Sequence, residues 1–196
     1  EKAIEELPTH GKVGYVSANH NAVEDYVAFA VSTIDCRLDG MKIAVDCANG
    51  ASYETAFKAL NKLGANVEAI HNTPDGVNIN HMCGSTHMES LQAYVTSIGA
   101  DIGIAFDGDA DRMLAVDENG KLIDGDQIMA ACAKFMRDNG TLKQNTLVAT
   151  VMSNLGLFMA GEKIGINIPR TKVGDRYVLE EMLAKGYNPH HSTKVP

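Results

Sequence analysis

The sequence is poor in the features that mark disulfide-rich and redox proteins. Its 196 residues contain four cysteines, and none of them shows C-x-x-C spacing: Cys36, Cys47, Cys83 and Cys132. Three of the four lie in or beside apolar runs, so we interpret them as small buried hydrophobic residues. We therefore expect no disulfide framework, a reducing environment and a cytoplasmic protein.

Excess positive charge and long apolar runs are also missing. The sequence contains 17 Lys and Arg residues and 25 Asp and Glu residues, which gives a net charge of −8. Nucleic-acid binders need a basic face, so we expect no nucleic-acid partner. No apolar run approaches the length of a membrane span, and no signal peptide is apparent, so we expect no membrane partner. The composition, 45% hydrophobic and 21% charged, is ordinary for a globular protein.

Apolar periodicity along the first 110 residues alternates between that of helices and that of strands. Helical spacing occurs in three stretches: 23–34, 53–63 and 88–98. Short strand-like runs lie between and after them: 41–47, 67–70 and 101–106. This order predicts an α/β fold, with three-layer α/β/α units and mixed, mostly parallel sheets.

The pattern restarts after a strong hairpin signal. Asn119-Gly120 separates the strand-like runs 113–116 and 121–123, so we place a domain boundary near it. Further helices and strands are expected in the order 125–137 (helix), 147–151 (strand), 155–164 (helix), 166–171 (strand) and 177–184 (helix). We therefore expect one complete domain, 21–120, and a truncated second one, 121–188. Residues 1–20 are expected to be a linker or the end of a preceding domain, and 189–196 a non-native tail.

Three acidic residues, Asp107, Asp109 and Asp111, alternate along one short stretch. The apolar run 102–106 just before them predicts a buried strand, so the acids should lie on the loop at its carboxyl end. Ligands of α/β sheets bind at such edges. Unpaired carboxylates so close together repel, and Mg²⁺ takes oxygen ligands. The stretch therefore predicts a Mg²⁺ site.

Three other interpretations of this stretch stay open. A solvated acidic turn is one, because Asp and Gly are common in turns. An EF-hand is another, with Glu118 at position 12, although Arg112 stands where the loop glycine belongs and the flanks are strand-like. A phosphatase that uses one Asp of a D-x-D pair as nucleophile is the third, although its usual lysine and acidic pair are not found in order.

The acidic stretch resembles the metal loop of the α-D-phosphohexomutase superfamily. Several other stretches narrow the resemblance to its phosphoglucosamine mutase branch: 45–51 (VDCANGA), 74–80 (PDGVNIN), 83–87 (CGSTH), 124–129 (DGDQIM), 152–157 (MSNLGL) and 172–178 (KVGDRYV). The resemblance covers about residues 20–188. It identifies 21–120 as domain two of four in that family and 121–188 as part of domain three.

The resemblance implies an enzyme that interconverts glucosamine 6-phosphate and glucosamine 1-phosphate through a 1,6-bisphosphate, for amino-sugar nucleotide and cell-wall precursor synthesis. Domain one of such an enzyme carries a phosphoserine, and domain four a phosphate-binding loop. The implied partners are a phosphorylated hexosamine and the missing domains one and four. Asp107, Asp109 and Asp111 would hold Mg²⁺, and Arg112 would stabilise the phosphate. Gly174, Asp175 and Arg176 match the sugar-contacting loop of domain three.

Structural interpretations compete with these functional ones. Arg112 could form a surface ion pair, and residues 174–176 could simply begin a helix, where Asp175 is favourable. Ser153-Asn154 indicates a helix N-cap. Cys83 and His87 have the spacing of a metal pair, but a loop packed on itself is favoured. Asp46, Asn49 and Asn78 are interpreted as turn and cap residues.

No stretch matches the serine motif of the family, so we expect this fragment to lack mutase turnover. A standalone module for Mg²⁺ or phosphosugars remains the alternative, as does a phosphomannomutase or phosphoglucomutase relative. The preference for glucosamine rests on the resemblance alone. A truncated second domain is also expected to expose apolar surface and to self-associate.

Overall fold

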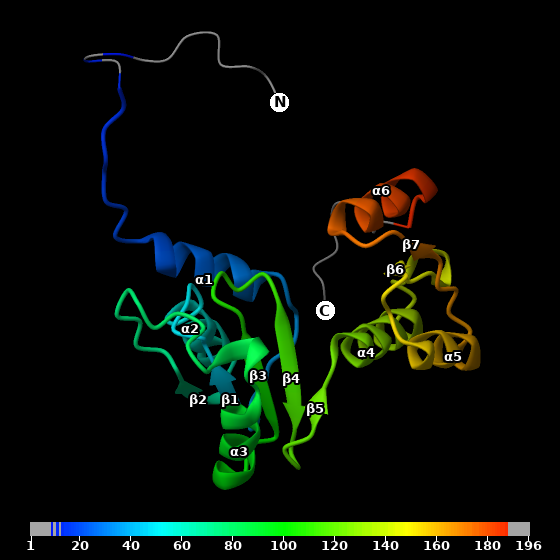
Figure 1. The fold of residues 1–196 in the computed structure, drawn as a ribbon, viewed down its shortest axis with the longest axis horizontal. Coiled ribbons are helices and arrows are strands. Elements are labelled where there is room, and N and C mark those ends of the chain that lie inside the picture. Colours follow the sequence, from blue (N-terminus) through cyan, green and yellow to red (C-terminus); the bar gives the residue numbers. More distant parts are fainter. Residues whose placement is uncertain (1–8, 10, 12, 188–196) are drawn as a thin grey trace.

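The computed structural model describes residues 9, 11 and 13–187. The expected tail, 189–196, and most of the first twelve residues lie outside the described residues. In the described part, six α-helices and two small sheets form two units (Figure 1). The mixed α/β prediction is confirmed.

The first unit is built on a five-stranded sheet with the order β2-β1-β3-β4-β5. Its strands are β1 (Lys42–Asp46), β2 (Asn66–Ile70), β3 (Ile102–Phe106), β4 (Met113–Asp117) and β5 (Leu122–Ile123). The strands β2, β1 and β3 run parallel, whereas β4 and β5 join antiparallel. Its helices are α1 (Ala22–Ser32), α2 (Thr55–Lys62), the 3₁₀ turn η2 (Gly84–Thr86) and α3 (Glu89–Ile98).

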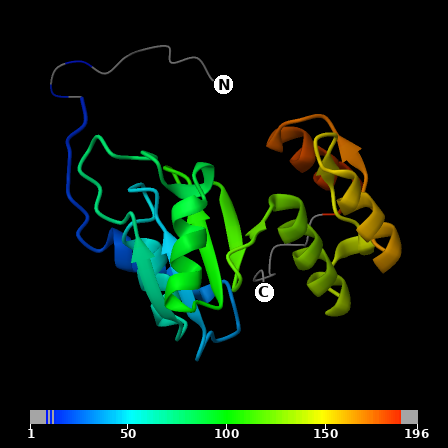
Figure 2. The ribbon, with the colours of Figure 1, turned by 60° about the horizontal axis from the view of Figure 1, so that its bottom comes forward.

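Alternating side chains of β1 pack on both faces of this sheet. Ala44 faces α3, where Leu91 and Val95 are fully buried. Ile43 and Val45 face the opposite side and pack with residues that precede β2 and with α2. Figures 1 and 2 show α3 on one side of the sheet and α1 with α2 on the other. A strand buried on both faces explains the continuous apolar run of β1.

The hairpin between β4 and β5 follows the sequence signal. Asn119 and Lys121 donate backbone N–H groups to the Asp117 carboxylate, at 3.0 and 2.8 Å, and Gly120 adopts a φ of 80°. Because β5 pairs with β4, the first sheet extends to Ile123. The boundary at 120/121 stays a prediction.

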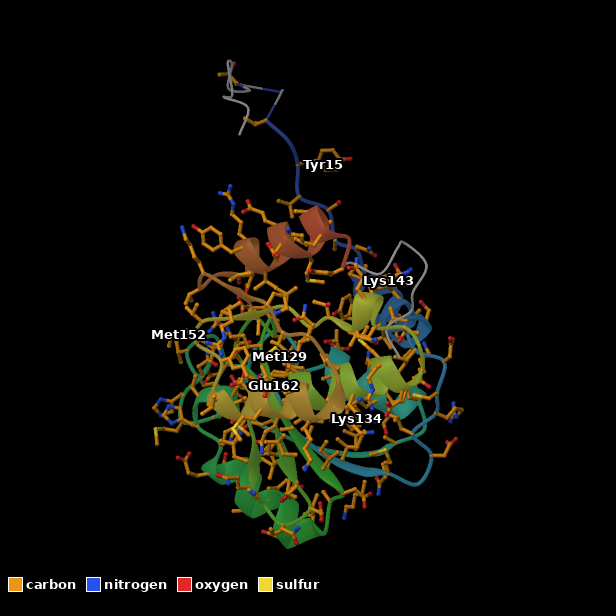
Figure 3. The ribbon with its side chains drawn as sticks, turned by 90° about the vertical axis from the view of Figure 1, so that its right-hand side faces the viewer. Tyr15, Met129, Lys134, Lys143, Met152 and Glu162 are labelled. Carbon is orange, nitrogen blue, oxygen red and sulfur yellow. The ribbon has the colours of Figure 1, made fainter. Side chains whose placement is uncertain are left out.

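The second unit contains α4 (Gly125–Asp138), η3 (Lys143–Asn145), β6 (Ala149–Thr150), α5 (Leu155–Ile164), β7 (Arg170–Thr171) and α6 (Asp175–Lys185). Residues of α4 and α5 contribute Ala133 and Leu157 to its core, beside Val148 and Ile166. Asp124 and Gln127 form a reciprocal capping box at the start of α4. Figure 3 views this unit from outside, with Met129 and Lys134 of α4 and Glu162 of α5 in front.

The strands of the second unit are shorter than predicted. Leu147, Ala149 and Val151 each donate a backbone N–H to the neighbouring strand, so the chains run side by side over the predicted length. Pro169 lacks an N–H, so it cannot donate the backbone hydrogen bond to the other strand that a parallel ladder requires at this position. Regular pairing is therefore limited to 149–150 with 170–171, beside an isolated bridge between Thr146 and Asn167.

The apolar surface of the second unit bears on the expected self-association. Leu179 and Leu183 of α6 are more than half exposed, and Met152 is 74% exposed. Self-association through this surface stays a prediction. None of the helices in the described part of the chain is long and apolar enough to cross a membrane.

Candidate metal centre

The three predicted acidic residues lie together on the loop that joins β3 to β4, residues 107–112, which we call the acidic loop. One carboxylate oxygen from each of Asp107, Asp109 and Asp111 can be chosen so that all three lie within 4.8 Å of one another. Asp107 is half-buried, while Asp109 and Asp111 are exposed. The loop lies at the carboxyl end of β3, at the upper edge of the sheet in Figure 1. One divalent cation could contact oxygens from all three side chains.

Backbone hydrogen bonds shape the acidic loop. Ala110 donates its N–H to the Asp107 carbonyl at 3.1 Å and adopts a φ of 61°. The Arg112 N–H donates to Asp107 Oδ1 at 3.2 Å. The left-handed Ala110 turns the chain back toward β4, within a loop where one oxygen from each of the three carboxylates comes close to the others. The flanking strands exclude an EF-hand, which needs helices on both sides of its loop.

Mutual repulsion is the main electrostatic feature of the acidic loop. The negative charge of Asp109 raises the pKa of Asp111 above its usual range, and partial desolvation and the charge of Asp107 act in the same direction. Arg112 opposes this only weakly, since its Nε lies 3.8 Å from Asp111 Oδ1 and its side chain is 81% exposed. The surface ion pair is thus present but long. The donor set is hard oxygen with excess negative charge, which suits Mg²⁺.

The second predicted site, residues 174–176, forms the start of α6. Gly174 has a φ of 130°, a value that side chains rarely permit, and Asp175 lies in the first turn. Arg176 donates to Glu180 at 2.7 Å, which raises the pKa of the arginine, and it remains largely exposed. In Figures 1 and 2 this end of α6 is the one nearer the first unit. The helix-start interpretation is confirmed, and contact with a sugar stays a prediction.

The remaining candidates fall into structural roles. Asn154, and not Ser153, caps α5 by accepting the Leu157 N–H at 3.0 Å. Asn78 accepts the Asp75 N–H at 3.0 Å within its own turn. Cys83 lies next to Asp46 and His71 rather than forming a pair with His87.

Sequence reasoning missed the group made by Asp46, His71 and Cys83. One ligand atom from each lies within 4.8 Å of the others, and Asp46 and Cys83 are fully buried. These residues are distant in sequence, so no spacing pattern joins them. The available signal was an aspartate at the end of the apolar run of β1, where a buried charge needs partners.

Comparison with known proteins agrees with this architecture. The model for the α/β/α domain II of phosphoglucomutase/phosphomannomutase matches residues 22–120, and that for domain III matches 124–189. A solved phosphoglucomutase/phosphomannomutase family protein from Burkholderia thailandensis superposes with a TM-score of 0.70 at 26% identity, over 85% of this chain and 36% of its own. The fold and the acidic loop thus define a phosphohexomutase-type pair of α/β/α units.

Curated relatives give the same result at higher identity. The chain is 59% identical to the phosphoglucosamine mutase of Clostridium acetobutylicum over 181 residues, and 57% identical to that of Acetivibrio thermocellus over 182. These matches cover 92% and 93% of this chain but only 40% of each relative. The chain belongs to the phosphoglucomutase/phosphomannomutase family, and it spans about 40% of the length of the relatives it matches.

Proposed function

We propose that this chain is the Mg²⁺-binding part of a phosphoglucosamine mutase that interconverts glucosamine 6-phosphate and glucosamine 1-phosphate. The observation that carries the proposal is the convergence of Asp107, Asp109 and Asp111 within 4.8 Å at the edge of a domain-II sheet. Relatives named phosphoglucosamine mutase at 55–59% identity support this sugar over mannose or glucose. We also propose that this enzyme acts in the cytoplasm.

The chemistry required of this part is charge compensation. Phosphoryl transfer demands that negative charge on the moving group be offset and that the reacting oxygens be held in line. A Mg²⁺ ion held by Asp107, Asp109 and Asp111 would supply a Lewis acid for that phosphoryl group. Arg112, the exposed last residue of the acidic loop, would hold a phosphate oxygen through a planar fork of N–H donors. Gly174, Asp175 and Arg176 would contact the hexosamine hydroxyls.

The phosphoserine would come from another part of the same enzyme, as would a phosphate-binding loop. No stretch of this sequence matches the family's serine motif. We therefore propose that the chain alone performs no turnover and that its partners are the remaining domains and a phosphorylated hexosamine. A bacterial pathway that builds amino-sugar nucleotides would use the product.

Mixing experiments test this proposal directly. The chain alone should give no glucosamine 1-phosphate in a coupled assay, and no inorganic phosphate from glucosamine 6-phosphate. Adding the separately expressed remaining domains of a relative, together with Mg²⁺, should restore turnover, and the Asp109→Asn chain should not. Turnover by the chain alone would refute the division of labour, and phosphate release by it would favour a phosphatase.

A further inference from the structure

A buried carboxylate at the end of the strand next to β3 is not one of the proposed Mg²⁺ ligands. Asp46 ends β1, next to β3 in the sheet, and has no solvent-exposed surface. Its Oδ1 accepts the Ala48 N–H at 2.9 Å, and its Oδ2 accepts the Gly84 N–H at 3.0 Å. The same Oδ2 lies 2.9 Å from His71 Nδ1, and because a carboxylate can only accept, we assign the ring hydrogen to that nitrogen. One side chain thus joins three segments: the turn after β1, the residue after β2, and the loop before α3.

The segments that Asp46 joins pack directly against the backbone of the acidic loop. The Ala51 N–H donates to the Gly108 carbonyl at 2.8 Å, and Gly50 is so close to that carbonyl that no side chain fits between them. A methyl group on Gly84 would lie 2.6 Å from the Phe106 carbonyl oxygen. The backbone at residues 50–51 therefore packs directly on the backbone of Gly108, and that of Gly84 on Phe106, the residue before the acidic loop. A displacement of either of these supporting segments would displace the acidic loop.

These supporting segments adopt backbone conformations that need external restraint. Ala48, Asn49, His71 and Asn80 all have positive φ values, between 48° and 56°. Residues other than glycine adopt such values at an energetic cost and retain them only where surrounding contacts fix them. Ala48 donates its N–H to Asp46 and its carbonyl accepts the Asn80 N–H at 2.9 Å, while the Asn49 N–H donates to the His71 carbonyl. Asp46 contacts two of these residues directly, through the Ala48 N–H and the His71 ring, and each of the two is bonded to another member of the group.

We propose that Asp46 is a positioning residue for the acidic loop: through Ala48, His71 and Gly84 it sets the spacing of the three carboxylates that bind the metal. The inference rests on the proposed Mg²⁺ function. Asp46 itself touches neither metal nor substrate.

Asp46, His71 and Cys83 could also be considered as a site for a soft metal ion such as Zn²⁺. Hydrogen bonding argues against it, because Asp46 Oδ2 already accepts two N–H groups, from His71 and Gly84, and is not free to bind an ion. Cys83 Sγ has only a long contact to Asn49 Nδ2 at 3.9 Å. Burial, and then the charge of Asp46, raise the pKa of the Cys83 thiol, which favours the protonated form over the thiolate that a metal needs.

Three variants test the positioning role in the chain as it exists. Asp46→Asn keeps the shape of the side chain but turns an amide NH₂ toward at least one N–H donor. His71→Ala removes the side-chain donor, whereas His71→Asn keeps a donor and tolerates the positive φ. We expect Asp46→Asn and His71→Ala to weaken Mg²⁺ binding about 10- to 100-fold by titration calorimetry, as loss of a supporting partner does in other metal sites. His71→Asn should recover most of the affinity.

Amide hydrogen exchange supplies a readout that needs no metal. Exchange at Ala51, Ala110 and Arg112 should accelerate in Asp46→Asn relative to the amides of α2, on the opposite face of the sheet from α3. Val95→Ala is the matched control, because Val95 is fully buried on the α3 face of the sheet. It should lower overall stability while leaving both the Mg²⁺ affinity and the relative exchange of the acidic loop unchanged.

The outcomes separate this inference from the proposed function. If Asp46→Asn binds Mg²⁺ as the unaltered chain does, with unchanged loop exchange, the positioning role is refuted and the metal site stands. If the unaltered chain binds no Mg²⁺, the metal function fails, and loop exchange alone decides the role of Asp46. Zn²⁺ that stabilises the unaltered chain but not Cys83→Ser would overturn the inference in favour of a second metal site.

Discussion

Asp46 and the carboxylates of the acidic loop are the same side chain in opposite environments. Asp46 is buried and accepts three N–H groups within 3.0 Å. Asp109 and Asp111 are exposed, and their mutual repulsion raises the pKa of Asp111. The buried carboxylate is satisfied by the fold, whereas those of the acidic loop have oxygens close enough together for one cation to contact all three side chains. The comparison separates the proposed positioning residue from the proposed metal ligands.

The largest expected effect is on stability, from removal of the satisfied carboxylate. Asp46→Ala leaves the buried N–H groups of Ala48 and Gly84 without an acceptor, whereas the partly exposed ring of His71 can turn to water. Each unsatisfied buried donor costs about 1–3 kcal/mol, so we expect a loss of at least about 2 kcal/mol in urea unfolding. Asp109→Ala should not destabilise the metal-free chain. Equal losses of unfolding free energy in Asp46→Ala and Asp109→Ala would contradict the distinction between a buried, satisfied carboxylate and exposed ones.

The next effect is on Mg²⁺ affinity. Asp109→Asn removes a proposed ligand, so binding by titration calorimetry should weaken by more than the roughly 100-fold that loss of an outer partner can cost. Glu118→Gln is the matched control, since it removes one negative charge from the exposed hairpin beyond the other end of β4. Equal loss of Mg²⁺ affinity in both variants would indicate attraction to the overall negative charge and not coordination at a specific site.

The same substitution should affect the metal-free chain in the opposite direction. Asp109 is the largest cause of the raised pKa of Asp111, so Asp109→Asn relieves repulsion in the folded state. We expect a higher melting temperature for Asp109→Asn than for the unaltered chain in EDTA, and a lower one in saturating Mg²⁺. A variant that melts below the unaltered chain in both conditions would show a structural role for Asp109.

A smaller effect should appear with pH. The raised pKa of Asp111 means that the folded chain binds this proton more readily than the unfolded chain does. The repulsion is therefore fully present above the raised pKa and is relieved as the pH falls through it, and protons compete with Mg²⁺ in that window. Calorimetry should show weaker Mg²⁺ binding as the pH falls toward the carboxylate range, by up to about tenfold per unit. Affinity that is independent of pH there would contradict coordination by Asp111.

The smallest effect concerns cysteine reactivity. Burial raises the pKa of the Cys47 thiol to about 11, and Cys83 is also shifted upward, whereas Cys36 and Cys132 are exposed. Iodoacetamide at neutral pH should therefore modify Cys36 and Cys132 first, as peptide mass spectrometry would show. Fast labelling of Cys83 in Asp46→Asn, but not in Val95→Ala, would show that the hydrogen-bonded group around Asp46 opens locally in that variant.

Much of the first unit was predictable because its elements are locally encoded. The run 101–106 became β3, Asn119-Gly120 became the hairpin turn, and the three aspartates lie together at the predicted sheet edge. Periodicity and turn residues are properties of neighbours in sequence. The EF-hand alternative fails because the strand-like flanks of the acidic loop form strands, β3 and β4.

The support of the site was not predictable in this way. Asp46, His71 and Gly84 meet only once β1, β2 and the loop before α3 are assembled, and the positive φ values of Ala48 and His71 have no sequence signature. Asp46 was interpreted as a turn residue, which its bond to Ala48 bears out, but its wider role needs three-dimensional contacts. The shortening of β6 and β7 likewise depended on how Pro169 sits in the ladder.

The most direct test of the central claim is a crystal structure of the chain grown with Mn²⁺, an ion that takes similar oxygen ligands and scatters anomalously. The account predicts one anomalous peak in contact with carboxylate oxygens of Asp107, Asp109 and Asp111, and none in crystals of Asp109→Asn. Fully occupied Mn²⁺ elsewhere, or aspartates that diverge into solvent with no ion between them, would contradict it.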